Sequence, residues 1–145
     1  MSAELLIANT LRIAREDLDG ALLLASRANR NAVYLCEQAA EKVIRAVLTS
    51  EGKHAGIRHR LDEMVDLVPD ENPLKPMLRE IEELAAYATA YRYPTSSGRI
   101  PTAPAGGEFV ELARKVDTAL CEAASRFGVD FTKKGLAASK SGPIR

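Results

Sequence analysis

The chain has 145 residues, of which 46% are apolar and 28% are charged, and its 20 basic and 20 acidic side chains give no formal net charge. This length and composition predict one soluble domain with a core of its own, and exclude a disordered or low-complexity protein. The balanced charge argues against a protein that grips nucleic acid broadly through its phosphates, although a local basic patch stays open.

The first half of the chain is dominated by helical periodicity. Apolar residues at helical spacing predict a first helix over residues 3–27 and a second over residues 32–50. Asn31 is the expected N-cap of the second helix, and Gly52 is expected to end it. Since the second helix is apolar almost all round over its first half, we expect it to lie at the centre of a bundle.

The second half predicts three more helices, over residues 59–68, 74–91 and 108–127. Three prolines and three glycines between residues 94 and 107 predict a loop that is long for a compact domain, and such loops are often functional or mobile. No stretch alternates convincingly with period two. The sequence therefore predicts an all-α fold, an up-and-down bundle of about five helices.

The domain organisation follows from these elements. Residues 1–128 are the expected bundle, and residues 129–145 are expected to be a loosely ordered C-terminal tail. Cys36 and Cys121 stand in apolar helical patterns without metal or disulfide spacing, so we expect two buried free thiols. The absence of an apolar run of membrane-spanning length and of a secretory N-terminal pattern predicts a cytoplasmic protein without membrane contact.

Tyrosines gather at the end of the fourth predicted helix. Tyr87, Tyr91 and Tyr93 are three of the four tyrosines in the chain, and Arg92 lies among them. An arginine beside aromatic rings can stack on them and still present its planar fork to phosphate. Core packing, with Arg92 bonded to the last helix carbonyls, is the alternative.

Two further sets of polar residues qualify as candidates. Tyr34 and Gln38 lie one turn apart on the second helix and could reach one ligand, with a salt-bridged exposed stripe as the alternative. A basic cluster over residues 53–60, which includes His54 and His59, could contact an anion or could be a solvated loop. The two histidines lack the spacing of a helical metal site, so we expect no metal and no other cofactor.

These residues carry a resemblance to a known family. The run from Asn31 to Lys42, NAVYLCEQAAEK, resembles the second-helix pattern of HEPN domains. His59-Arg60-Leu61 is similar to the His-x-Leu step of that family, and Tyr91-Arg92-Tyr93-Pro94 is similar to its Arg-Tyr-Pro segment. The resemblance implies a five-helix bundle that is usually a homodimer. It also implies a frequent association with a minimal nucleotidyltransferase in a toxin–antitoxin-type pair.

Many HEPN proteins are metal-independent RNases with an arginine followed, after four to six residues, by a histidine. This sequence lacks that motif, since no histidine follows Arg92 or Arg99. Such an RNase needs an acid or base that titrates near neutral pH, which histidine supplies. The departure from the motif favours a non-catalytic binding subunit.

The resemblance and the residues together predict a protein that binds a nucleotide, or the substrate of a partner nucleotidyltransferase. Arg92 and Lys42 are expected to meet phosphate, Tyr91 to stack on a base and His59 to orient the ligand, with Tyr34 and Gln38 nearby. Two alternatives stay open. One is an RNase toxin that acts on RNA through a variant site around Arg92, and the other is a dimeric scaffold without a ligand.

Overall fold

The computed structural model describes residues 3–57, 60–104 and 106–133. Within these ranges the chain forms six helices and no strand. The helices are α1 (Ala3–Ser26), α2 (Asn31–Ser50), α3 (Leu61–Asp66), α4 (Lys75–Ile81), α5 (Leu84–Arg92) and α6 (Gly106–Phe127). None of them is both long enough and apolar enough to cross a membrane.

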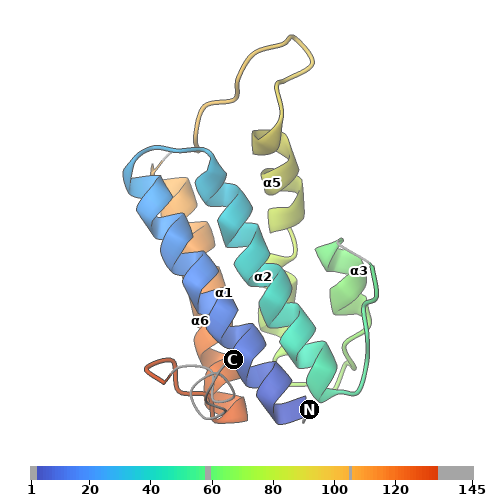
Figure 1. Ribbon diagram of the computed structural model, residues 1–145. Coiled ribbons are helices and arrows are strands. Elements are labelled where there is room, and N and C mark those ends of the chain that lie inside the picture. The colour runs from blue at the N-terminus through green and yellow to red at the C-terminus, as the bar shows by residue number, and fades with distance from the viewer. Residues whose placement is uncertain (1–2, 58–59, 105, 134–145) are drawn as a thin grey trace, which may run out of the picture.

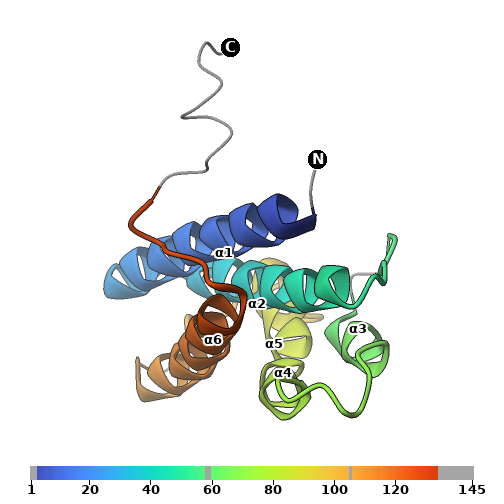
Figure 2. The same ribbon diagram turned by 90° about the horizontal axis from the view of Figure 1, so that it is seen from below.

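The helices form an up-and-down bundle (Figure 1). α1 rises from the N-terminus, α2 descends beside it, α4 and α5 rise one after the other, and α6 descends again. The short α3 covers one side of the lower half of α2 (Figure 1). Figure 2 shows α2 between α1 and α4, and α6 contacts both α1 and α4. The predicted all-α bundle is therefore confirmed.

α2 lies at the centre of this bundle. It contacts α1, α3, α5 and α6, and 12 of its 20 residues are buried. Alanines at positions 32, 39, 40 and 46 are almost fully buried, and such small side chains let the neighbouring helices approach closely. The central position that its apolar pattern predicts is confirmed.

The single helix predicted over residues 74–91 is wrong in one respect, because the chain divides it into α4 and α5 at Glu82 and Glu83. Both residues keep helical backbone angles, with ψ of −24° and −15°. The amides of Ala85 and Ala86 donate to the carbonyls three residues before them, at 3.5 and 3.1 Å, so a tighter 3₁₀-like turn joins the two helices. No proline or glycine marks this break in the sequence.

The ends of α2 are set by two loop residues. The Asn31 amide donates to Oδ1 of Asn29 at 2.9 Å, so Asn29 supplies the side chain at the helix start and the predicted N-cap, Asn31, is the first helical residue. Gly52 has a φ of +71°, and its amide donates to the Thr49 carbonyl at 3.0 Å. A residue in this left-handed conformation ends helices, so the predicted C-terminal glycine is confirmed.

The chain continues to pack after α6. Val129 and Phe131 are partly buried against the core, and the Arg15 guanidinium lies 5.7 Å from the centre of the Phe131 ring. Arg12 donates to the Asp130 carbonyl at 3.4 Å. Residues 134–145 of the predicted tail lie outside the described residues, and the domain boundary at residue 128 stays a prediction.

The two cysteines differ in exposure. Cys36 is buried in α2 as expected, but Cys121 is exposed, because it lies on the outer face of α6 while Leu120 and Ala123 point into the core. Burial raises the pKa of the Cys36 thiol to about 12, with the charge of Glu37 acting in the same direction.

We therefore expect a thiol reagent to label Cys121 quickly and Cys36 only after unfolding, since the thiolate is the reactive form. Titration with 5,5′-dithiobis(2-nitrobenzoate) should release one fast equivalent per chain, and a second in denaturant. In Cys121→Ser the fast equivalent should disappear. Two fast equivalents in the native wild type would contradict the burial of Cys36.

Candidate ligand site at the arginine end of the bundle

Four arginines lie at one end of the bundle, which we call the arginine end. Arg27 and Arg30 belong to the connection between α1 and α2, Arg92 ends α5, and Arg99 lies in the loop before α6. Because the bundle runs up and down, these segments meet at the upper end of the molecule in Figure 1.

The arginine end carries more positive than negative charge. Residues 20–36 and 84–107 contain no aspartate or glutamate, and Glu108 follows them in the first turn of α6. Within the described residues none of the four guanidinium groups has a carboxylate partner. The arginines that do pair with carboxylates are Arg15, Arg45, Arg60, Arg79 and Arg114. The zero net charge of the chain thus hides a positive end, which attracts anions.

Arg92 stacks on two tyrosines. Its guanidinium carbon lies 4.8 Å from the ring centre of Tyr34 on α2 and 5.5 Å from that of Tyr93. Both distances lie within the range of cation–π attraction, which fixes the plane of the guanidinium. The N–H groups at its edge stay available to a phosphate or carboxylate. The structure thus brings together Arg92 and Tyr34, two of the predicted site residues.

Tyr91 lies beside Arg92 but packs differently. It is partly buried and packs against the core. Burial raises the pKa of its phenol, and the negative charge of Glu108 and the neighbouring Tyr87 act in the same direction. The Tyr91 hydroxyl is therefore protonated at neutral pH and available as a hydrogen-bond donor.

Lys42 and Gln38 lie further along α2 and are engaged with other groups. The Lys42 ammonium pairs with Asp17 on α1 at 2.6 Å, and Gln38 donates to the neighbouring Glu37 carboxylate at 3.0 Å. Lys42 stands eight residues after Tyr34, about 12 Å along the helix axis. The structure does not bring Lys42 to the arginine end, and its charge is compensated by Asp17.

The polar residues of α2 are more buried than those of a solvent-exposed stripe would be. Glu41 and Arg45, one turn apart on α2, form an ion pair at 3.0 Å, but Glu37 and Glu41 are both buried. The interpretation of these residues as a solvent-exposed stripe is therefore wrong, because neighbouring elements cover this face of the central helix.

The basic cluster after α2 lies towards the other end of the bundle. His59, a predicted site residue, lies outside the described residues, as does Arg58. Arg60 pairs with Asp62 at 2.9 Å and with Glu63 at 3.4 Å. His54 lines a small cavity of about 310 Å³ together with Arg45 and Lys53. In the described ranges no group of three or more histidine, cysteine or acidic residues could hold a metal ion.

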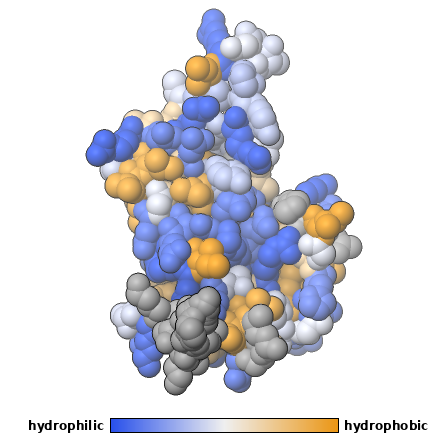
Figure 3. Space-filling model, viewed as in Figure 1, coloured by the Kyte–Doolittle hydropathy of each residue, from blue (hydrophilic) through white to orange (hydrophobic). Residues whose placement is uncertain are grey.

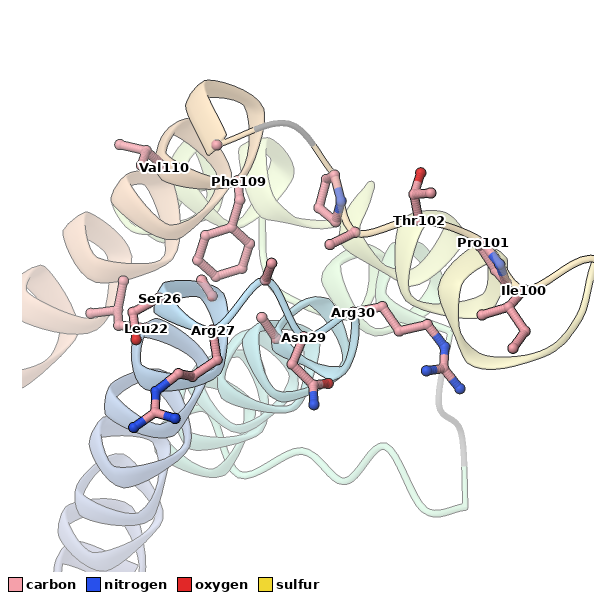
Figure 4. Close-up of a pocket in the computed structure, with 16 residues that line it drawn as sticks. Leu22, Ser26, Arg27, Asn29, Arg30, Ile100, Pro101, Thr102, Phe109 and Val110 are labelled. Atoms are coloured by element: carbon pink, nitrogen blue, oxygen red, sulfur yellow. The ribbon is translucent and has the colours of Figure 1, made fainter.

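Sequence reasoning missed a cleft at the arginine end. This cleft, of about 1000 Å³, is lined by the end of α1, the connection to α2, residues 100–104 and the first turn of α6 (Figure 4). Arg27 and Arg30 lie on its wall, and Nε of Arg30 is buried without a hydrogen-bond partner among the described residues. Leaving a buried donor unpaired costs about 1–3 kcal/mol. The length of the predicted loop at 94–107 was the only indication of this cleft in the sequence.

Among the comparisons with known proteins, one gives a match, to a family model. No curated protein and no solved structure matches the chain significantly. The family model of the HEPN domain matches residues 7–123, from the second turn of α1 to the last turns of α6. This range is well over half of the chain and includes the predicted second-helix and Arg-Tyr-Pro segments, so the chain belongs to the HEPN domain family.

Proposed function

We propose that this HEPN protein binds a nucleotide, or the nucleotide-bearing substrate of a partner enzyme, at the arginine end of the bundle. The observation that carries the proposal is Arg92, an unpaired guanidinium held against Tyr34 and Tyr93. In this proposal the protein is the non-catalytic partner of a minimal nucleotidyltransferase in a toxin–antitoxin-type pair. Membership of the HEPN family supports a role that involves nucleotides or RNA, and the partnership is our proposal.

The chemistry of the residues fits a phosphate-bearing ligand with an aromatic base. Arg92 would donate two parallel hydrogen bonds to phosphate oxygens, and Arg99 would add charge from the neighbouring loop. Tyr93, which is 60% exposed, offers a ring on which a base can stack. Tyr91 would donate from its hydroxyl or hold the end of α5 in place.

The remaining predicted residues take lesser parts in the proposal. Lys42 would reach a ligand only after leaving Asp17, so we assign it a role in fixing α2 against α1. Gln38, which accepts from Lys42 at 3.5 Å, would hold that ammonium in place. His59 stays a proposed ligand residue. We further propose that the protein is a cytoplasmic homodimer, which light scattering of the purified protein would test.

Thermal unfolding with a panel of nucleotides tests the proposal directly. A nucleotide at 100 times its Kd should stabilise the native protein by about 2.7 kcal/mol, which raises the Tm measurably. The panel should include ATP, GTP, AMP and inorganic phosphate, with and without a co-expressed nucleotidyltransferase. Stabilisation by nucleotides and little by phosphate is expected. If no nucleotide raises the Tm in either setting, the binding proposal fails and a ligand-free scaffold is favoured.

The same preparation tests the competing assignment as an RNase. Incubation of the wild type with RNA should leave the RNA intact, because no histidine follows Arg92 in the chain. Cleavage that disappears in Arg92→Ala would overturn the non-catalytic assignment in favour of a toxin with a variant active site.

A further inference from the structure

The cleft at the arginine end has a predominantly apolar lining with charge at one side. Three segments converge on it, and their apolar side chains are Leu22, Ile100, Pro101, Pro104, Phe109 and Val110. Several of these side chains are open to solvent, for Ile100 is 72% and Val110 62% exposed. Figure 3 shows apolar side chains gathered over the upper end of α1, above a hydrophilic middle.

Among the described residues that line the cleft, the charged ones are Arg27 and Arg30. Neither guanidinium has a carboxylate partner within the described residues, and no acidic residue lines the cleft. Nε of Arg30 is buried and lacks an acceptor in the same part of the chain. An anion stabilises such a guanidinium more than a neutral acceptor does, since a carboxylate or phosphate can accept hydrogen bonds from several of its N–H groups at once.

We propose that this cleft is a binding site for a small amphipathic anion, separate from the nucleotide contact at Arg92. The apolar body of the ligand lies along the lining between Phe109 and Ile100, and its carboxylate, sulfonate or phosphate head meets Arg30, whose side chain extends toward Ile100 (Figure 4). The volume of about 1000 Å³ lies within the range of small-molecule pockets, which combine an apolar lining with a few polar groups.

The unpaired charge favours a small anion over a second copy of the chain as the occupant. A copy that covered these apolar side chains would bury the two guanidinium groups, and buried charges need partners. Residues 20–36 and 84–107 carry no acidic residue, and Glu108 in the first turn of α6 would offer a symmetric contact only one carboxylate for the two guanidinium groups of each chain. An anionic ligand brings the missing charge itself.

Two fluorescent probes test the proposal, 1-anilinonaphthalene-8-sulfonate and its uncharged relative N-phenyl-1-naphthylamine. The wild type should bind both. Arg30→Gln should weaken binding of the sulfonate about tenfold, the loss expected for one charge-assisted hydrogen bond, and leave the uncharged probe within about twofold. Ile100→Trp, which enlarges an exposed apolar side chain beside Arg30, should abolish binding of both.

Matched variants elsewhere separate this result from general effects on charge or apolar surface. Arg126→Gln removes the same charge at the far end of α6, and Ile13→Trp enlarges an exposed apolar side chain on α1 outside the cleft. Both should bind the probes as the wild type does. Native circular dichroism of each variant excludes dye binding to a partly unfolded chain.

Three results would overturn the proposal. The first is unchanged probe binding in Ile100→Trp, and the second is an equal loss of both probes in Arg30→Gln. The third is a wild type that is dimeric in light scattering while Ile100→Trp is monomeric, which would show that a second copy fills the cleft. These three outcomes do not depend on whether nucleotides bind at Arg92, so the two proposals can fail separately.

Discussion

Truncation of Ile44 to alanine should lower the free energy of unfolding by about 2–5 kcal/mol. Ile44 is fully buried in α2, and α2 contacts four other helices of the bundle. The removed atoms lose their transfer free energy, and helices packed on several sides cannot collapse into the space that they leave. Urea unfolding followed by circular dichroism would measure the change at constant m-value.

Ile57 provides a matched control for this substitution. It is 92% exposed in the segment after α2, so Ile57→Ala deletes the same atoms without opening a cavity. We expect a change within about 0.5 kcal/mol, as for other surface positions. Similar losses in the two variants would show that α2 is not the centre of the bundle.

The central position of α2 could be predicted because it depends on local information. The side chains of α2 itself are valine, leucine, alanine and isoleucine on most of its faces, and a helix that is apolar on most faces is typically buried. The C-terminal end of α2 could be predicted for the same reason, since Gly52 supplies the left-handed conformation that other residues adopt at a cost.

The break between α4 and α5 could not be predicted from the local sequence. Glu82 and Glu83 form helices well, and their backbone angles remain helical. At the division the backbone hydrogen bonds join residues three apart and not four apart. The two pieces pack on different helices, α4 on α6 and α5 on α2. Tertiary packing also decides the exposure of Cys121, because the apolar stripe of α6 is narrower than its many alanines suggest.

The candidate site shows the same limit. Tyr34 and Arg92 were each predicted as ligand residues for their own chemistry, but α2 and α5 must be packed before the two side chains meet. Lys42 was predicted as a phosphate contact, and only the packing of α1 against α2 shows its pairing with Asp17. The cleft has no local pattern at all, because three segments distant in sequence form it.

Replacement of Arg92 by glutamine should weaken nucleotide binding by about 1.5–3 kcal/mol, which is about 10-fold to 150-fold in Kd. The variant should keep its Tm without ligand, since Arg92 is exposed and has no carboxylate partner in the described residues. Calorimetric titration of the best nucleotide from the panel gives the Kd. Arg126→Gln, a charge change at the opposite end of the bundle, should bind as the wild type does.

Arg92→Lys separates the charge of this residue from its geometry. Lysine keeps the charge but loses the planar fork and the stacking on Tyr34, so its Kd should fall between those of the wild type and Arg92→Gln. A lysine variant that binds fully would mean that Arg92 acts as a point charge only.

A double-mutant cycle with Tyr34→Leu then tests whether the stack positions the guanidinium. If Tyr34 acts through Arg92, Tyr34→Leu should weaken binding in the wild type and have little further effect in Arg92→Gln. Additive losses would instead mean that the ring contacts the ligand on its own. In the absence of ligand, both single variants should have a Tm similar to that of the wild type. This comparison distinguishes a loss of positioning from a loss of fold.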